Sequence, residues 1–247
     1  MIWKNIVFLI ILFSFLFLCS CSIVNESEEI SPILHYPFSG NAQDESGNGY
    51  DGFVNNATLA YDRFGNENSA YEFNGETSFI DCGDILNNLQ VPFTVCAWVN
   101  CFSNKIGQPI FYTDLHESFT SHNYYGVGFA LSVMDGDGVT VLDSTRVAVR
   151  YGDGLGSGYQ YRRTRHGTSF LSENEWIHVA AVVEGPQDMK LYINGILDGG
   201  SYSGSGGDMV HCSWHAYIGV VFHGLIDDLR VFDEALNTEA INQIIQE

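Results

Sequence analysis

The sequence is poor in proline and in basic side chains. Its 247 residues include 5 prolines and 10 lysines and arginines, against 30 aspartates and glutamates, for a formal net charge of −20 at pH 7. A chain this acidic repels phosphate backbones, which excludes nucleic acid as a general partner. Acidic loops that offer oxygen ligands instead favour a hard cation such as calcium.

Long hydrophobic runs are also missing, apart from one at the N-terminal end. Residues 6–18 are apolar except for Ser14. This run is too short for a transmembrane helix, which needs about 20 residues, and is typical of a signal-peptide core. The following LCSC, residues 18–21, resembles the lipobox of bacterial lipoproteins. That resemblance implies that residues 1–20 are a lipoprotein signal peptide and that Cys21 is acylated, with an ordinary secretory signal or a signal anchor as the alternative.

The next segment, residues 21–31, is polar and shows no hydrophobic period, so we expect a flexible tether. The remainder, residues 32–247, has the length of one β-sandwich domain, since sandwiches of about 200–250 residues often form a single domain. Acyl chains on Cys21 would hold the protein to a lipid bilayer. We therefore expect a cell-envelope protein that is lipid-anchored to a bacterial membrane, at the outer membrane or the cell surface.

The abundance of glycine and aromatic residues predicts an all-β fold. The chain has 26 glycines, 17 phenylalanines and 13 tyrosines, which is typical of short strands joined by tight turns. Asn74-Gly75 and Asn194-Gly195 are strong hairpin signals. Asn237 can cap a short C-terminal helix. The predicted strands are 33–38, 70–75, 78–82, 93–99, 109–112, 125–133, 139–142, 146–151, 175–183, 190–193 and a closing strand within 218–236.

Zinc-type cysteine spacings are lacking, because the chain contains no CxxC. An exported location would permit disulfides, each worth about 2–4 kcal/mol. Three complete pairings are possible, and spacing does not choose among them. The cysteines of the expected domain are Cys82, Cys96, Cys101 and Cys212.

Two acidic features attract attention as candidate metal ligands. Asp227 and Asp228 are adjacent within the closing strand, so their side chains should point to opposite faces and one should face the interior. A buried carboxylate needs a partner, either a cation or a polar turn from elsewhere. The turn-rich run 39–52 holds Asp44 and Asn48, which form either a partial oxygen cage or part of a plain surface loop.

Arginines are concentrated in one region of the acidic chain. Five fall within twenty positions, and they either balance nearby carboxylates on an exposed hairpin or form a patch for an anionic ligand beside tyrosines that stack on a sugar face. Aromatic loops at 114–125 and 202–215 could contribute further rings. The five arginines are Arg146, Arg150, Arg162, Arg163 and Arg165. The candidate ligand-binding residues are Tyr124, Tyr125, Tyr159, Tyr161, Arg162, Arg163, Arg165 and Trp214.

Five runs together resemble the laminin-G-like, concanavalin A-like lectin/glucanase superfamily over about residues 33–236. The resemblance implies a two-sheet antiparallel jelly-roll sandwich, with its first and last strands side by side and a short C-terminal helix added. The runs are HYPFSGNAQDESGNGYDG, DRFGNENSAYEFNG, FTVCAWVN, EWIHVAAVVEGPQDMKLYINGIL and IGVVFHGLIDDLRVFDEAL.

The same resemblance implies a structural calcium ion near the ends of those strands. The matching positions in this sequence are Asp44, Asn48 and Asp227, with Asp228 next to them. The alternative is that Asp227 accepts hydrogen bonds from turn amides.

The paired carboxylates of the glucanase branch, E-x-D-x-E or E-x-D-x-x-E, are absent. This departure favours binding over catalysis. We expect a non-catalytic surface lipoprotein that binds a glycan or a surface protein through loops at one end of the sandwich. A polysaccharide-degrading hydrolase or lyase with a divergent site, and a purely structural or adhesive module, remain as alternatives.

Overall fold

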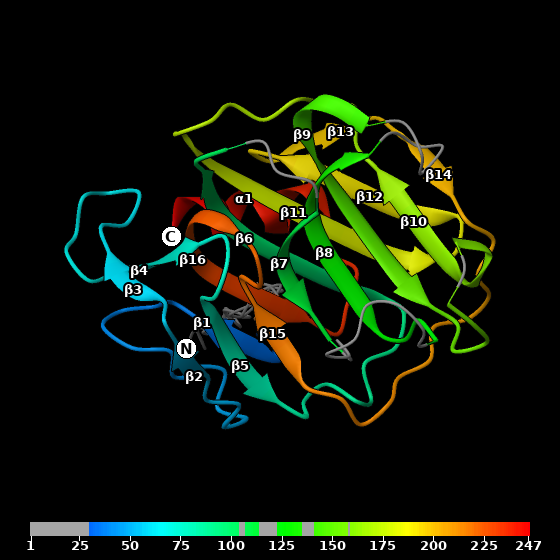
Figure 1. Ribbon diagram of the computed structural model, residues 1–247, viewed down its shortest axis with the longest axis horizontal. Helices are drawn as coiled ribbons and strands as arrows, with labels where there is room; N and C mark the ends of the chain where they lie inside the picture. The colour runs from blue at the N-terminus through cyan, green and yellow to red at the C-terminus, as the bar shows by residue number, and fades with distance from the viewer. Residues whose placement is uncertain (1–29, 104–106, 114–122, 135–140, 158) are drawn as a thin grey trace, which may run out of the picture. The chain divides into compact units, whose positions relative to one another are not determined.

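The structure is a computed structural model that describes residues 30–247, apart from 104–106, 114–122, 135–140 and 158 (Figure 1). The expected signal peptide, most of the tether and the lipidation site Cys21 lie outside the described residues. The described part of the chain contains no helix long and apolar enough to cross a membrane.

The expected all-β fold is confirmed, because two antiparallel sheets account for the described strands. In Figure 1 the strands β7–β10 of sheet B lie in front of sheet A. Sheet A has the order β13 (Ile196–Asp198), β12 (Asp188–Ile193), β11 (Trp176–Gly185), β6 (Phe93–Cys101), β16 (His223–Phe232), β4 (Ala70–Asn74) and β3 (Thr58–Ala60), with β1 (Leu34–Tyr36) also paired to β16. Sheet B has the order β14 (Ser201–Ser203), β10 (Arg162–His166), β9 (Val141–Gly152), β8 (Val127–Met134), β7 (Gln108–Tyr112), β15 (Ala216–Ile218), β5 (Phe79–Gly83) and β2 (Phe53–Asn55).

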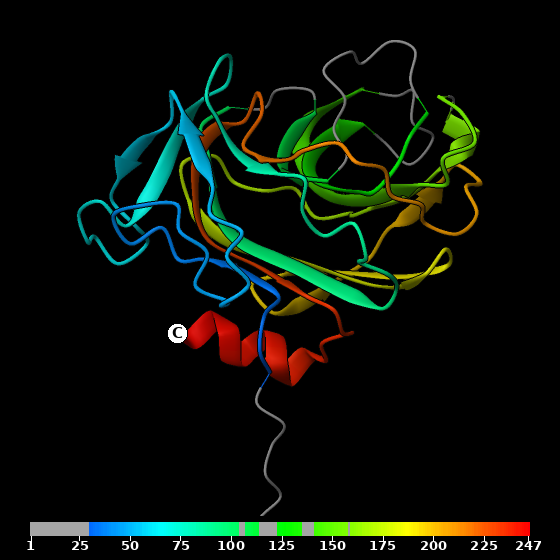
Figure 2. The ribbon, with the colours of Figure 1, turned by 90° about the horizontal axis from the view of Figure 1, so that it is seen from below.

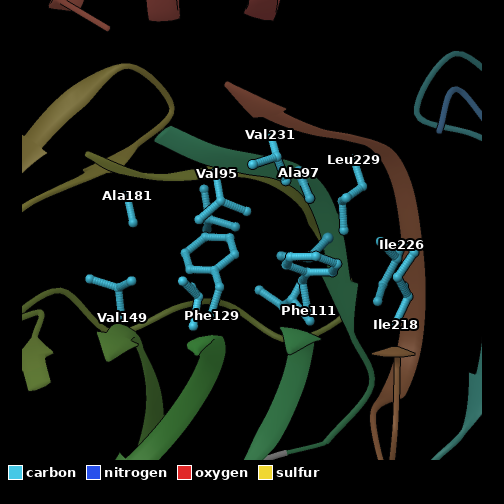
Figure 3. Packing of buried hydrophobic residues seen from close by; sticks show 14 of the residues in the cluster. Val95, Ala97, Phe111, Phe129, Val149, Ala181, Ile218, Ile226, Leu229 and Val231 are labelled. Carbon is cyan, nitrogen blue, oxygen red and sulfur yellow. The ribbon is translucent and has the colours of Figure 1, made fainter. Parts of the chain in front are cut away.

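The core lies between the two sheets and follows the two-residue period of the strands. Val95 and Ala97 of β6 point down from sheet A, and Phe111 and Phe129 of sheet B point up to meet them (Figure 3). These side chains are at most 1 % exposed. Burying each of the larger ones contributes about 1.5–3 kcal/mol, so the inward positions of both sheets stabilise the sandwich.

The first and last strands lie side by side, as the resemblance implied. Leu34 of β1 is paired with Val231 of β16 in antiparallel register. On its other side β16 pairs with β6, but the register shifts between Asp227 and Arg230, and Asp228 has a φ of 48°. This β-bulge breaks the side-chain alternation at the acidic pair.

The C-terminal helix α1 (Thr238–Gln246) covers the outer face of sheet A (Figure 2). The Asn237 side chain caps it by accepting a hydrogen bond from the Ala240 N–H at 2.9 Å. Ala240, Ile241 and Ile244 are buried on the face toward the sheet. No helix among the described residues covers the outer face of sheet B, which we call the open face, and outward residues at its centre such as Tyr112 and Thr164 are 9 % and 7 % exposed.

The expected disulfides are wrong within the part of the chain that the structure describes, because no disulfide links the four cysteines. Cys96 and Cys101 are five positions apart on β6 and so face opposite sides of sheet A. Cys82 lies on β5 of sheet B. Burial raises the pKa of Cys82 and of Cys96 to about 12, as expected for packed, unreactive thiols.

Candidate functional site

The open face of sheet B carries a continuous row of residues, one from each strand. Their cross-strand pairing puts them on one face, and the neighbouring core residues Phe111, Phe129 and Val149 put that face outward. We call this set the outer row. In order across the sheet it consists of Ser203, Thr164, Arg150, Gly128, Tyr112, Tyr217, Asp81 and Phe53.

The centre of the outer row is an arginine stacked on a tyrosine. The Arg150 guanidinium carbon lies 4.9 Å from the centroid of the Tyr112 ring. Both side chains lie over Gly128, where an added Cβ would approach Tyr112 Cε1 to 2.8 Å and Arg150 Nε to 3.0 Å. The Tyr112 hydroxyl has no hydrogen-bond partner among the described residues. Glycine at this position therefore makes the stacked pair possible.

The β5 end of the row combines aromatic rings with polar edges. The Tyr217 ring meets Phe79 edge to face, with centroids 5.6 Å apart. His215 Nδ1 lies 2.9 Å from Asp81 Oδ1, and its ring centroid is 6.1 Å from that of Tyr217. Phe53 is 72 % exposed. Apolar ring surface beside hydrogen-bonding groups is the usual lining of a small-molecule site.

The rim beside Gly152 brings together four residues that the sequence singled out. Arg162 stacks over the Tyr124 ring at 3.9 Å, and Tyr125 meets Trp214 edge to face at 5.5 Å. Arg162 is paired with Gly152, two positions from the Thr164–Arg150 pair, so it shares the face of the outer row. We call these four residues the aromatic rim.

Backbone contacts hold the aromatic rim in place. The Gly154 N–H donates to the Tyr124 carbonyl at 2.9 Å, and the Gly126 N–H donates to the Val210 carbonyl at 2.8 Å. A Cβ on Gly152 would lie 2.1 Å from the Tyr124 carbonyl oxygen, so the chain crosses directly over this glycine. Two sequence-distant loops thereby meet at one end of the open face.

The other candidate arginines turn away from this face, because strand alternation separates them from Arg162. Arg163 and Arg165 flank the Tyr202 ring at 4.6 and 4.8 Å. Their guanidiniums donate to backbone carbonyls, Arg163 to Gly204 at 2.7 Å and Arg165 to Gly200 at 2.7 Å. These two arginines hold the sheet edge together.

The two remaining candidates, Tyr161 and Tyr159, lie in the 3₁₀ turn Tyr159–Tyr161. The Tyr161 ring packs on Gly156, where a Cβ would approach it to 2.2 Å. The side chain of Tyr159 lies outside the described part.

The candidate metal ligand Asp44 is surrounded by hydrogen-bond donors from its own turn. Its Oδ1 accepts from the backbone N–H groups of His35 and Ser46, each at 3.0 Å, and its Oδ2 accepts from Tyr50 N at 3.1 Å. Burial opposes ionisation, but these hydrogen bonds lower the pKa of Asp44. Asn48 donates through Nδ2 to the Ile33 carbonyl at 2.9 Å, so both residues stabilise a turn.

The acidic pair of β16, Asp227 and Asp228, forms ion pairs with arginine guanidinium groups. Arg63 Nη1 lies 2.5 Å from Asp227 Oδ2, and Arg63 Nη2 lies 3.5 Å from Asp228 Oδ2. Asp228 also accepts from Arg230 Nε at 2.8 Å and lies 3.0 Å from His35 Nε2. The expectation that the two carboxylates face opposite sides is wrong, because the bulge at Asp228 turns both toward Arg63.

Ionisation differs between the two carboxyl groups. Burial raises the pKa of Asp227 to about 7, although Arg63 favours its charged form. Burial also opposes ionisation of Asp228, but hydrogen bonds from His35 and Arg230 lower its pKa to about 2. Asp228 is thus the fixed negative charge of the pair.

This arrangement does not fit calcium, which takes six to eight oxygen ligands. The carboxylates of Asp44, Asp227 and Asp228 face N–H donors, and Arg63 stands where a cation would meet the acidic pair. Across the described ranges, no group of three or more histidine, cysteine, aspartate or glutamate side chains is placed to hold a metal ion. The ends of the chain are tied together by ion pairs and hydrogen bonds instead.

Fold and site define a two-sheet jelly roll with one open, aromatic face. The chain belongs to the concanavalin A-like lectin/glucanases superfamily, whose family model matches residues 74–242. The comparison with curated protein sequences finds no relative.

Solved structures share the fold at low identity. Domain 4 of AbnA, a GH43 extracellular arabinanase from Geobacillus stearothermophilus in complex with arabinotriose, is 20 % identical, with a TM-score of 0.64 over 89 % of this chain and 100 % of that one. A botulinum neurotoxin type C structure, whose cell entry is described as dependent on two ganglioside molecules, is 16 % identical, with a TM-score of 0.60 over 87 % of this chain. The binding domain of Paraclostridial Mosquitocidal Protein 1 is 16 % identical, with a TM-score of 0.62. The present chain spans about half the length of the last two, 51 % and 52 %.

Sequence reasoning missed three residues of the outer row. Tyr112, Tyr217 and Asp81 come from three different strands, and none of them belongs to a local motif. The signal that could have found them is strand alternation, since each sits at an outward position beside buried neighbours.

Proposed function

We propose that this protein is a non-catalytic, lectin-like protein that binds carbohydrate through the outer face of sheet B. The outer row carries this proposal, because it places the half-buried ring of Tyr217 beside Asp81 and in line with the exposed ring of Phe53, on a face that no described helix covers. Aromatic rings stack on the apolar faces of sugars, while charged and hydroxyl groups bond their hydroxyls. The expected loops at one end contribute the aromatic rim.

The relatives support a binding role. The arabinanase domain is described in complex with arabinotriose, and the neurotoxin with dependence on gangliosides. Both ligands are or carry carbohydrate, and the match covers all of the arabinanase domain and 51 % of the neurotoxin chain. For this chain we propose carbohydrate as the class of ligand, without proposing arabinotriose or a ganglioside in particular.

We also propose that the mature protein is a surface lipoprotein. The LCSC run supports acylation of Cys21, and the acidic tether of residues 21–31 would extend the domain away from the bilayer. Metabolic labelling with a fatty-acid analogue tests this. We expect label on the wild-type chain and none on Cys21→Ala, and an unlabelled wild-type chain would contradict the anchor.

The binding proposal is tested with a glycan array followed by calorimetry on the best ligand. Tyr217→Ala should weaken binding by about fivefold to tenfold, because one stacking contact contributes on the order of 1 kcal/mol. The matched control is Tyr61→Ala, which removes a tyrosine that is 57 % exposed in the loop after β3. It should bind like wild type.

Two outcomes would replace the proposal. An array without signal, together with binding of the protein to whole cells, would favour a structural or adhesive module. Release of reducing ends or unsaturated products from polysaccharides would show an enzyme.

A further inference from the structure

A single carboxylate lies among the aromatic rings at the β5 end of the outer row. Asp81 is paired directly with Phe53 of β2 on one side and with Tyr217 of β15 on the other. Phe79 precedes Asp81 by two positions on β5 and so shares its face, in agreement with the edge-to-face contact between Phe79 and Tyr217. The His215 ring lies against the carboxylate. We call these five residues the Asp81 site.

The Asp81 site is accessible from solvent. Phe53 is 72 % exposed, and the side chains of His215 and Asp81 are 51 % and 26 % exposed. Phe79 and Tyr217 are half-buried. A ligand can therefore reach both the carboxylate and the rings that surround it.

The polar groups of the Asp81 site present hydrogen-bond acceptors to a ligand. Asp81 Oδ1 accepts from the Gly83 N–H at 2.8 Å, and His215 Nδ1 lies 2.9 and 3.1 Å from the two carboxylate oxygens. An ionised carboxylate has no proton to donate, so a neutral His215 carries its N–H on Nδ1 and leaves Nε2 as an acceptor. These two donors occupy part of the carboxylate, because its oxygens offer about four acceptor positions. The site therefore calls for a ligand that donates.

Positive charge within the outer row lies far from this carboxylate. The one arginine of the row, Arg150, lies four strands from Asp81, or about 19 Å at ordinary strand spacing. Its guanidinium is stacked on Tyr112. The chain as a whole has a net charge of −20. An anionic group at the Asp81 site would be repelled, and a cationic group would be attracted.

Aromatic rings around a carboxylate suit an ammonium group. The faces of phenylalanine and tyrosine rings attract a cation, and a carboxylate accepts strong, charge-assisted hydrogen bonds from it. The apolar face of a sugar that carries the amine can rest on the same rings. Phe53 and Tyr217, on the two sides of Asp81, provide such rings on both neighbouring strands.

We infer that the saccharide taken by this face carries a protonated amine, as an amino sugar does, and that its ammonium group lies against Asp81 with Phe53 and Tyr217 beside it. This inference rests on the proposed carbohydrate-binding function and names the class of its ligand.

The experiment compares two probes that differ only at the amine. Calorimetry measures the binding of glucosamine oligomers and of N-acetylglucosamine oligomers of the same length, at a pH at which the free amine is protonated. Acetylation removes the positive charge. We expect the glucosamine oligomers to bind about tenfold more tightly, which corresponds to about 1.4 kcal/mol. Added salt should reduce this preference.

Variants assign the preference to the Asp81 site. Asp81→Asn keeps the size of the side chain and an oxygen for the Gly83 N–H but loses the charge, so it should bind both probes about equally. The matched control is Glu72→Gln, which changes the net charge by the same amount at an exposed position of β4 in sheet A, and it should keep the full preference. Phe53→Leu is the second variant, because leucine is apolar but has no ring face for a cation, and it should reduce the preference at least about twofold.

Each alternative result has a distinct meaning. If glucosamine oligomers bind the wild-type protein no more tightly than their acetylated partners, the amino-sugar inference is overturned, while binding of any neutral glycan leaves the proposed function standing. A preference that is undiminished in Asp81→Asn and in Phe53→Leu would come from the net charge of the chain and would also overturn the inference. If no carbohydrate of any charge binds, the proposed function itself fails.

Discussion

At the scale of single residues, His178 shows how burial sets ionisation. Its side chain is 0 % exposed, and neither ring nitrogen has a hydrogen-bond partner among the residues described. It meets Trp98 edge to face at 5.4 Å. Burial lowers the pKa of His178 to about 4, so this imidazole is neutral in the folded protein.

The pH dependence of stability follows from that shift. The ordinary histidine pKa is about 6.5. Between pH 6.5 and pH 4 the unfolded chain binds a proton at His178 that the folded chain does not. The stability that neutral His178 contributes is therefore fully present above pH 6.5. As the pH falls toward 4, the free energy of unfolding decreases by about 3 kcal/mol for this reason.

His178→Phe should remove this loss, because phenylalanine keeps the ring packing and has no group to protonate. Urea unfolding at pH 7 and at pH 4.5 measures the free energy of unfolding. We expect this free energy to decrease less between the two pH values in the variant than in wild type. Ile196→Val, a change without a titratable group at a position that is 74 % exposed, is the control and should follow wild type. Equal falls in His178→Phe and wild type would contradict a buried neutral histidine.

At the scale of elements, hydrophobic alternation predicted the long strands and missed the short ones. The sequences of β6 and β11 are apolar and end at clear turns, so they are readily predicted to be strands. Edge strands such as β2 and β14 have three residues each, which is too short for a period to show. The two strands expected at 139–142 and 146–151 fall together in the single strand β9 (Val141–Gly152), because Asp143 and Ser144 continue the strand instead of forming a turn.

The bulge in β16 is an element that the pattern could not reveal. Two adjacent aspartates predict opposite faces only if the strand is regular, and Asp228 adopts a positive φ instead. What makes that conformation favourable is the pairing with Arg63, Arg230 and His35. Those partners are brought in by other strands and loops, so the local sequence does not contain the answer.

The cap of α1 gives a prediction at this scale. Asn237→Ala removes the hydrogen bond to the Ala240 N–H and should lower the free energy of unfolding by about 1 kcal/mol. Gln243→Ala, at an exposed position of the same helix, should change it by less than about 0.5 kcal/mol. Denaturant titration decides, and equal effects of the two substitutions would contradict the capping role.

At the scale of the whole molecule, the two sheets have different outer faces. The outer face of sheet A is covered by α1 (Figure 2), while sheet B presents the outer row and the aromatic rim. The fold class could be predicted because the long strands carry their own signals. The site could not, because it takes one residue from each strand of a sheet whose order follows from tertiary pairing.

The ion pairs that Arg63 makes with the last strand provide a prediction at this scale. Arg63 is paired with two carboxylates that are 2 % and 5 % exposed, Asp227 and Asp228. Removing one partner of a buried ion pair costs about 3–5 kcal/mol. For a domain of this size, each kcal/mol lowers Tm by about 2–4 °C. Arg63→Met should therefore lower Tm by roughly 6–20 °C, whereas Lys190→Met, which breaks an exposed pair, should lower it by less than about 4 °C.

A chelator separates this ion-pair account from the calcium site that the family resemblance implies. Because guanidiniums and backbone N–H groups meet the carboxylates of Asp44, Asp227 and Asp228, we expect EDTA to leave the calorimetric Tm of the wild-type protein unchanged. A fall in Tm with EDTA that added calcium reverses, and that Asp227→Ala abolishes, would contradict this account. In that case a metal ion, and not the Arg63 guanidinium, would neutralise Asp227 and Asp228 where β1 and β16 meet.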